Sequence, residues 1–300
     1  FAVAAALVFK ENKEAKKHQL VSGLAIRYNF YDDNTPVTSS VDEGVLQNQP
    51  DRWFLPGLFA QDNIKVANHA NLLVGSRLDV HSKHGLIFSP RLNFKWTPAS
   101  YVIRLGYGNG FRVVNVFSED HAALTGARDV IISEDLLPER SNNLNLNIEK
   151  IFFTGWSKVG LDATAFYTHF SNKIIPDYSN DDQITYANLA GYGVSKGISL
   201  NVKWQFEIPL TINIGATYMS VFSKQLNEQE ELVKENQLFT EPYSMTWSAS
   251  YNFTKADILL DITGNLYGPM QLPILENDFR PEFSNPFTLS NIKVSKDFSK

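Results

Sequence analysis

Strict alternation of apolar and polar residues over segments of about ten residues is the feature that most limits how this chain can fold. In residues 197–206 every second position is apolar: Ile198, Leu200, Val202, Trp204 and Phe206. The positions between them are small or polar: Gly197, Ser199, Asn201, Lys203 and Gln205. A period of two residues is typical of β-strands with one apolar and one polar face. The same period recurs in residues 91–96, 143–149 and 245–253, so the chain is predicted to be all-β.

The connections between the predicted strands alternate in length. Short connections are expected near residues 11–17, 67–71, 97–100, 154–158, 207–210 and 254–257, and long ones near 33–52, 112–140, 179–192, 225–240 and 273–286. His81 to Gly85 is the exception, because it is short where a long connection is due. Short periplasmic turns and long extracellular loops are typical of outer-membrane barrels. Within one long connection, residues 227–236 are predicted to form one or two helical turns.

Aromatic residues gather in two bands along the predicted strands. Those beside the short turns are Trp96, Tyr101, Phe152, Phe153, Trp156, Trp204, Phe206 and Phe253. Those toward the long loops are Tyr28, Phe30, Tyr107, Phe111, Tyr167, Phe170, Tyr218 and Tyr267. Amphipathic rings prefer the two membrane–water interfaces, so two bands favour a membrane barrel. The alternative is that Phe and Tyr are simply common in strands.

These patterns predict an antiparallel transmembrane β-barrel of which this chain supplies about 13 strands. An odd number of strands is unusual in bacterial barrels, so the barrel is expected to be incomplete. A soluble β-sandwich shows the same alternation, but its strands would be shorter and it would lack the two aromatic bands.

Composition excludes several other classes of protein. The chain has no cysteine, which excludes disulfides, thiolate metal sites and a cysteine nucleophile. Its net charge of -5 argues against nucleic-acid binding. No run of 18 apolar residues could form a membrane-spanning helix. No catalytic signature such as Gly-x-Ser-x-Gly is present, so we expect neither an enzyme nor a resident cofactor or metal.

Five short motifs follow one another between residues 54 and 150. They are Gly57-Leu-Phe-Ala-Gln-Asp62, Gly75-Ser-Arg-Leu-Asp79, Ser89-Pro-Arg-Leu-Asn93, Tyr107-Gly-Asn-Gly-Phe-Arg112 and Leu137-Pro-Glu-Arg-Ser-Asn-Asn143. In this order they resemble the barrel strands of TonB-dependent receptors. Val113-Val114 stands where many members have Ala-Pro, and with the segment Asp120 to Arg128 it resembles receptors of the Bacteroidetes.

The resemblance implies a 22-stranded outer-membrane barrel plugged by an N-terminal domain. Residues 1–300 would be the C-terminal part of that barrel, without the plug or the TonB box. The implied function is TonB-dependent active import of a scarce nutrient such as iron-siderophore, haem or cobalamin, or of a glycan. The implied partners are the TonB complex of the inner membrane, outer-membrane lipid and a small metal chelate or vitamin. A passive porin and a β-sandwich carbohydrate-binding module remain the alternatives.

Six residues on predicted extracellular loops are candidates for ligand binding. The histidines are His81, His84 and His121, whose imidazoles could bind haem iron or a transition metal. The arginines are Arg112, Arg128 and Arg140, whose guanidinium groups could grip an anionic siderophore. The alternatives are solvated loop histidines, and strand-end arginines that face water or pair across the lumen.

Polar residues on the predicted lumen face form a separate group. They are Arg91, Lys95, Asn145, Asn147, Glu149, Asn201 and Lys203. Buried polar groups need hydrogen-bond partners. These residues are therefore expected to bond to one another or to a plug rather than to a ligand.

Overall fold

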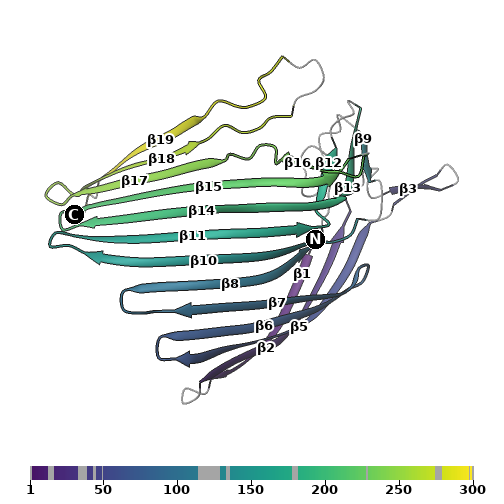
Figure 1. Cartoon of the computed structure of the whole chain (residues 1–300), viewed down its shortest axis with the longest axis horizontal. Helices are drawn as coiled ribbons and strands as arrows, with labels where there is room; N and C mark the ends of the chain where they lie inside the picture. The colour runs from purple at the N-terminus through teal and green to yellow at the C-terminus, as the bar shows by residue number, and fades with distance from the viewer. Residues whose placement is uncertain are drawn as a thin grey trace. The chain divides into compact units, whose positions relative to one another are not determined.

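The fold was analysed in a computed structural model (Figure 1). It describes residues 2–12, 17–32, 39–42, 45–48, 50–113, 129–132, 136–177, 182–227, 229–273, 279–296 and 298. The chain divides into two compact units. One comprises residues 1–94, 107–142 and 171–189, and the other comprises residues 95–106, 143–170 and 190–300. In the described ranges there is no helix long and apolar enough to span a bilayer.

The long strands run in chain order. The earlier ones are β1 (Ala2–Asn12), β2 (His18–Tyr31), β5 (Asp51–Ala67), β6 (Ala70–His81), β7 (Gly85–Trp96) and β8 (Tyr101–Arg112). The later ones are β10 (Glu139–Phe153), β11 (Ser157–Ser171), β14 (Gly191–Phe206), β15 (Leu210–Leu226), β17 (Tyr243–Phe253), β18 (Ile258–Tyr267) and β19 (Phe287–Lys296). Their hydrogen-bonded order is β1-β2-β5-β6-β7-β8-β10-β11-β14-β15-β17-β18-β19, with a further strand on β15 completing a 14-stranded sheet. The predicted number of about 13 strands is confirmed by this path.

The neighbouring long strands of each unit are antiparallel, whereas the short strands β13 (Gln183–Asn188) and β9 (Asp129–Ile132) of the first unit pair in parallel. The first unit pairs β1 with β2, β2 with β5 and β5 with β6. The second pairs β14, β15, β17, β18 and β19 in succession, as Figure 1 shows. β5 and β15 reach 17 residues each, well beyond the roughly 9–11 that a tilted strand needs to cross a bilayer.

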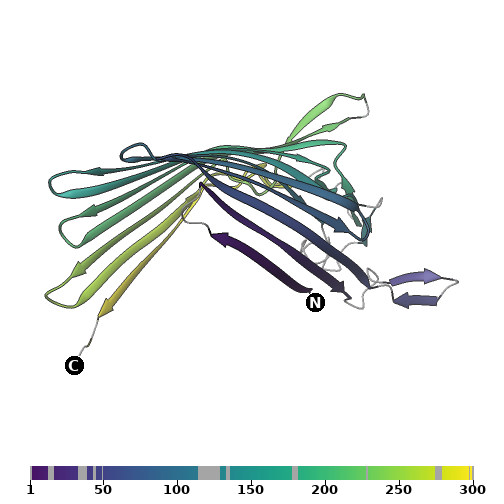
Figure 2. The same ribbon diagram turned by 90° about the horizontal axis from the view of Figure 1, so that it is seen from below.

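Short strands lie within the long connections. They are β3 (Ser39–Asp42), β4 (Val45–Asn48), β9 (Asp129–Ile132), β12 (Ile174–Asp177), β13 (Gln183–Asn188) and β16 (Leu232–Asn236). β12, β13 and β9 form a small sheet of their own, and β3 pairs with β4. Figure 2 shows the β3–β4 hairpin extending away from the ends of β2 and β5.

The helical turn predicted within residues 227–236 is wrong. In the structure β16 continues the antiparallel ladder of β15, from Leu226↔Leu232 to Phe222↔Asn236. The chain reverses at Asn227, whose side-chain carbonyl accepts the N–H groups of Gln229 at 3.0 Å and Glu231 at 2.8 Å. This local capping of the turn by an Asn side chain favours a strand hairpin over the predicted helical turns.

The apolar face of each unit is exposed rather than packed against a second layer. In the second unit, Ile198, Leu200, Ile214 and Tyr218 are 61%, 45%, 44% and 67% exposed. In the first unit Leu24, Phe54 and Leu58 are similarly open. A β-sandwich would bury these side chains against a facing sheet. Alternate exposed apolar positions along strands of this length are what a lipid-facing surface requires.

The band of aromatic rings beside the short turns is present in the second unit. Trp204 stacks on Phe206 with ring centroids 4.7 Å apart, and Trp156 lies 5.9 Å from Trp204. The ammonium group of Lys150 lies 4.6 Å from the centre of the Phe152 ring. Aromatic rings combined with a basic side chain are typical of a membrane–water boundary.

Replacing Leu200 with Arg should lower the free energy of unfolding by roughly 2–4 kcal/mol, because the charge enters the lipid-facing surface near mid-strand. Asn201→Arg is the matched control on the adjacent residue. Its side chain faces a hollow of about 350 Å³ that Glu149 and Asp162 also line, so the new charge can be accommodated. Denaturant unfolding of the native protein in lipid vesicles measures both values. Equal effects at the two positions would contradict this assignment of the faces.

Candidate functional site

His81 is a buried residue at the C-terminal end of β6, the end of the strand on the side of the long connections. It is 1% exposed, and its ring centroid lies 5.2 Å from that of Trp53 and 4.7 Å from that of His84. Its Nδ1 accepts the backbone N–H groups of Lys83 at 3.1 Å and His84 at 3.3 Å. Two donors on Nδ1 require the tautomer that carries its proton on Nε2. The structure therefore uses His81 to organise the turn, whereas the sequence placed it on a loop surface.

Gly85 completes the same turn. Its φ is +70°, in the left-handed region that favours glycine. Backbone hydrogen bonding between Ser82 and Phe54, 3.0 Å from N to O, fastens the turn to β5. These features stabilise the short turn that the sequence predicted between His81 and Gly85.

Arg77 and Asp79 form a bidentate ion pair on the polar face of β6. Nε of Arg77 lies 2.8 and 2.7 Å from the two carboxylate oxygens, and Nη2 lies 2.6 Å from Oδ1. Asp79 is fully buried and stands opposite Gly57 of β5. A Cβ on Gly57 would overlap the Asp79 carboxylate. The first two sequence motifs thus meet, because the glycine of one leaves room for the ion pair of the other.

Arg112 and Glu139 form a second ion pair, where β8 ends and β10 begins. Nε of Arg112 donates to Oε2 of Glu139 at 2.8 Å, and Nη2 lies 2.7 Å from the same oxygen. The other carboxylate oxygen accepts the N–H of Ile174 at 2.9 Å. Glu139 is buried, while the Arg112 side chain is 57% exposed. The carboxylate therefore orients an accessible guanidinium and fastens the start of β12.

Lys173 adds a second cation to this cluster. Burial lowers the pKa of Lys173 below its ordinary range; the charge of Glu139 opposes the shift and that of Arg112 adds to it. Two basic side chains therefore lie near one carboxylate, and we name Arg112, Glu139 and Lys173 the loop-side cluster.

Asn188 ties the segments around this cluster together. Its side chain donates to the carbonyls of Leu137 at 3.0 Å and Asn172 at 2.8 Å, and accepts the N–H of Leu137 at 2.7 Å. Asn172 itself has a φ of +53°, which Asn tolerates better than most residues. The end of β13 is thereby joined to the segments that precede β10 and β12.

The remaining candidate residues do not join this cluster. Arg140 is exposed, and the alternation along β10 places it on the same face as Leu144 and Leu146, opposite to that of Glu139. His121 and Arg128 lie outside the described residues. The structure thus brings His81 and His84 together and places Arg112 in an ion pair. The ligand-binding role of the six residues is untested and stays a prediction, although the face on which Arg140 lies argues against that role for Arg140.

A hollow of about 440 Å³ lies on the polar face of the first unit. Its charged lining residues are Arg77 and Arg91, beside Gln61, Asn109 and the glycines at 75 and 110. Asp79 neutralises Arg77. The hollow could therefore receive an anionic or hydrogen-bonding group from a ligand or from another part of the protein.

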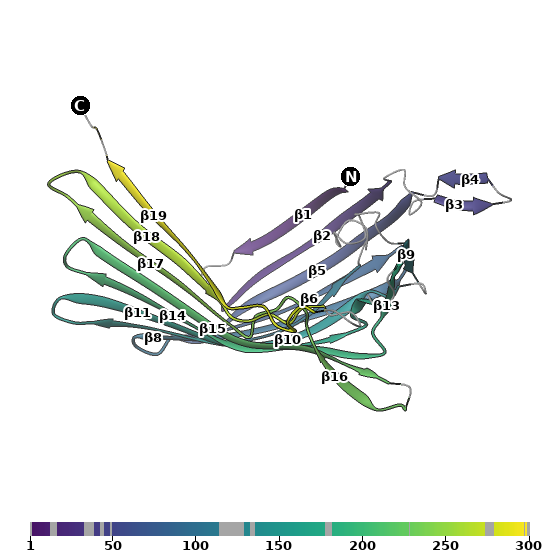
Figure 3. The same cartoon turned by 90° about the horizontal axis from the view of Figure 1, so that it is seen from above.

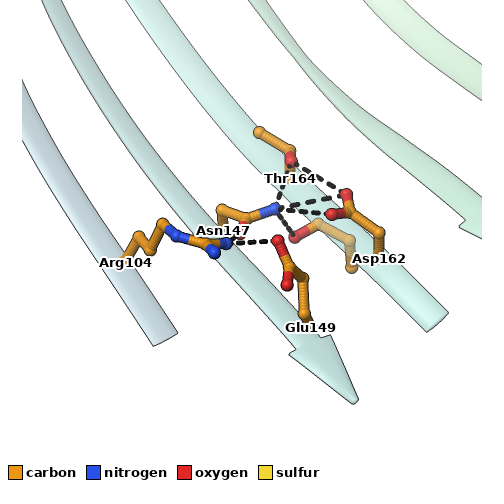
Figure 4. Close-up of polar contacts among 6 residues, drawn as sticks. Arg104, Asn147, Glu149, Asp162 and Thr164 are labelled. Atoms are coloured by element: carbon orange, nitrogen blue, oxygen red, sulfur yellow. Dashed lines mark hydrogen bonds and ion pairs between the residues drawn. The ribbon is translucent and has the colours of Figure 1, made fainter. Parts of the chain in front are cut away.

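The polar face of the second unit is linked by side-chain hydrogen bonds (Figure 4). Asn147 accepts from Arg104 at 2.7 Å and donates to Thr164 at 2.9 Å and to the Asp162 carboxylate at 3.2 Å. Arg104 also pairs with Glu149. Asn145 donates to Asn143 at 2.9 Å. The prediction that Asn145, Asn147 and Glu149 bond to neighbouring polar residues is confirmed.

The described parts of the chain contain no group of three or more His, Asp or Glu placed to hold a metal ion. The arrangement offers cationic and hydrogen-bonding side chains at the end with the long connections, and a network of paired polar groups along the sheet.

Comparison with known proteins defines the class. Residues 9–300 match a sequence model of the family described as TonB dependent receptor-like, beta-barrel. The chain therefore belongs to the TonB-dependent receptor-like β-barrel family, and the predicted antiparallel transmembrane barrel fold is confirmed.

Particular relatives are receptors for iron. The ferric enterobactin receptor PirA of Pseudomonas aeruginosa is 25% identical over 238 residues, which cover 72% of this chain and 30% of PirA. A crystal structure of the ferric enterobactin receptor PfeA of the same organism matches with a TM-score of 0.75 at 18% identity, covering 100% of this chain and 46% of PfeA. The FrpB iron transporter of Neisseria meningitidis gives a TM-score of 0.73 at 14% identity, covering 99% and 48%.

These structural matches establish the fold alone, since their identity is low. The chain spans about a third of the length of PirA and about half of the two solved structures.

Sequence reasoning missed four residues that organise the site. Glu139 and Asp79 lay within the quoted motifs, so their positions were marked but their roles were not. Lys173 and Asn188 carried no signal, because each acts through contacts with segments distant in sequence.

Gly57→Ala should lower the free energy of unfolding by about 1–3 kcal/mol, because the new methyl group overlaps the buried Asp79 carboxylate. Gly108→Ala is the control: it is also a strand glycine, but a Cβ there meets no atom within 4 Å. Thermal or denaturant unfolding of the native protein would show the difference. A loss of stability at Gly108 as large as that at Gly57 would refute the role given to the close approach.

Glu139→Gln should lower the free energy of unfolding by about 1–2 kcal/mol, because its hydrogen bonds to Arg112 and Ile174 lose the charge of the carboxylate. The exposure of Arg112 to solvent limits the loss. Hydrogen exchange should then accelerate at the amide of Ile174. Arg140→Gln changes the adjacent, exposed residue and should leave that amide unchanged. Unaltered exchange in Glu139→Gln would show that the carboxylate does not hold the segment.

Proposed function

We propose that this chain is part of the barrel of a bacterial outer-membrane receptor that actively imports a ferric siderophore. The observation that carries the proposal is the family match over residues 9–300, together with relatives that are ferric enterobactin receptors. Energy would come from the TonB complex of the inner membrane, acting through parts of the receptor other than the 300 residues described. The chain would act in transport and not in catalysis.

The charge at the loop-side end supports an anionic cargo. Siderophores that hold Fe3+ through three doubly ionised catecholate groups give ferric complexes with negative charge. Arg112 presents a guanidinium that is more than half exposed and is held in one orientation by buried Glu139, while Lys173 lies beside it. An oriented guanidinium binds carboxylate or catecholate oxygens in pairs. Arg128, from the same long connection, is proposed to add to this cationic surface.

The surroundings of the histidines favour haem less than a ferric siderophore as the imported ligand. Haem capture needs an accessible imidazole nitrogen, whereas His81 is buried and its Nδ1 already accepts two backbone N–H groups. His84 stacks on that buried ring. His121 is the remaining proposed histidine ligand. We therefore place ferric siderophore ahead of haem as the substrate.

The test measures uptake in a strain from which the native receptor gene is deleted, and in the same strain complemented with that gene. Radiolabelled iron should enter complemented cells as a catecholate siderophore complex, and uptake should stop when the proton-motive force is collapsed. Haem and radiolabelled cobalamin serve as parallel substrates. Uptake that persists without the proton-motive force would support a passive porin. Uptake of haem or cobalamin alone would overturn the proposed substrate.

Arg112→Gln in the complete receptor should raise the Kd for the ferric siderophore roughly tenfold or more, because a charge-assisted contact is lost. Arg140→Gln removes an equal charge from the opposite face of β10 and should change the Kd little. Binding to the purified receptor is measurable by quenching of intrinsic fluorescence. Equal effects of the two substitutions would indicate a diffuse charge effect and contradict the proposed contact.

A further inference from the structure

His81 holds the turn between β6 and β7 through an atom that can take up a proton. Its Nδ1 accepts the backbone N–H groups of Lys83 at 3.1 Å and of His84 at 3.3 Å. Only a neutral imidazole with its proton on Nε2 offers this acceptor, because both ring nitrogens of an imidazolium are donors. Protonation of Nδ1 therefore removes both hydrogen bonds and places a donor against two donors.

The surroundings of the His81 ring disfavour a positive charge. The residue is 1% exposed, and the rings of Trp53 and His84 cover it at centroid distances of 5.2 and 4.7 Å. Among the described residues, its buried Nε2 has no hydrogen-bond partner. Burial of a charge without an acceptor is costly. The closed turn therefore selects the neutral ring.

The charged groups nearest to the ring come from the turn and from the start of β5. Burial lowers the pKa of His81 below its ordinary value, His84 and Lys83 lower it further, and the carboxylate of Asp51 opposes the shift. That carboxylate already forms an ion pair with Lys83. It therefore compensates the ammonium group of Lys83 rather than a charge on His81.

The other strands packed around His81 supply no further unpaired carboxylate in their described residues. On β6, Asp79 lies two residues before His81 on the same face, but it is held in the ion pair of that strand. On β2, the guanidinium carbon of Arg27 lies 5.0 Å from the centre of the Trp53 ring. On β7, no charged residue precedes Arg91.

The turn that His81 organises also fastens the start of β5. The N–H of Ser82 donates to the carbonyl of Phe54 at 3.0 Å, and the N–H of Phe54 donates to Oγ of Ser82 at 3.1 Å. Lys83 pairs with Asp51, the first residue of β5. Figure 3 shows the β3–β4 hairpin beside this end of β5. Opening of the turn would therefore release the point at which that long connection enters the sheet.

His81 lies at the water-exposed end of its strand. It is the last of the 12 residues of β6, which starts after a short turn, whereas a tilted strand crosses the hydrocarbon in roughly 9–11 residues. The side chain of Lys83, two residues further on, is 53% exposed. A proton can therefore reach the turn from the medium outside the cell.

We propose that the turn from His81 to Gly85 is an acid-sensitive switch, closed on β5 when His81 is neutral and open when its Nδ1 takes up a proton. In the open state the imidazolium reaches water, and the N–H groups of Lys83 and His84 lose their shared acceptor. In the closed state one ring nitrogen accepts hydrogen bonds and the other carries the proton, so neither is available to a metal ion. The switch requires no particular cargo.

The direction of the pH dependence follows from linkage between protonation and opening. His81 has a lowered pKa in the closed turn and an ordinary value near 6.5 in the open one, so the open state binds one more proton between the two values. As the pH falls below about 6.5, the ratio of open to closed turn should rise about tenfold per pH unit, until the pH reaches the lowered pKa. Above about 6.5 the ratio should be constant.

The test measures hydrogen exchange at the amides of Lys83 and His84 in the complete native receptor in lipid nanodiscs. Rates are recorded from about pH 7.5 to about pH 5.5, above the ordinary pKa values of carboxylates, and are corrected for the intrinsic effect of pH on exchange. His81→Asn keeps an acceptor that does not titrate, because Oδ1 of Asn is bonded to Cγ as Nδ1 of His is. Its opening ratio should not change with pH. His84→Asn removes the other imidazole and should keep the slope of the unmodified receptor.

A flat profile of the unmodified receptor would overturn the proposal, as would a slope that persists in His81→Asn or disappears in His84→Asn. Should His81→Asn fail to close the turn at about pH 7.5, the profiles of the unmodified receptor and of His84→Asn decide alone. Siderophore uptake does not enter this measurement, so failure of the switch would leave the proposed import function standing.

Discussion

Backbone hydrogen bonding without water is the constraint on which this structure depends. A chain that crosses hydrocarbon as strands must pair every N–H and C=O with a neighbouring strand. The long antiparallel ladders satisfy this requirement, as between β14 and β15, where fifteen successive pairs run from Gly191↔Gln225 to Gln205↔Thr211. Once the ladder is fixed, the period of two assigns each side chain to one face. The exposed apolar face and the hydrogen-bonded polar face both follow from that assignment.

The two faces carry different tasks. On the polar face of the second unit, Asn147 bonds to Arg104, Asp162 and Thr164, so these side chains are paired with one another. At the loop-side end the pairing is asymmetric, because Glu139 is buried while its partner Arg112 remains more than half exposed. A buried anchor with an exposed cation is suited to hold a ligand-binding group in place.

Much of the fold could be predicted from the sequence, because the alternation within residues 197–206 and 245–253 is a local property. The strand number and the order of short and long connections followed from it. The small strands within the loops were not predictable: β16 is set by the turn at Asn227 and by pairing with β15. The candidate site was predicted only in part. Arg112 was found from its motif, but its partner Glu139, the burial of His81 and the nearby Lys173 depend on contacts between distant segments.

The most direct measurement of the central claim is lipid accessibility along β14. The 300 residues contain no cysteine, so single cysteines at positions 198 to 203 can each carry one spin label in the membrane-embedded native protein, with any cysteine elsewhere in the polypeptide replaced. Collision with oxygen reports lipid, and collision with a water-soluble relaxant reports the polar side. The account predicts oxygen maxima at 198, 200 and 202 and minima between them. A profile without this period of two, or with the opposite phase, would contradict it.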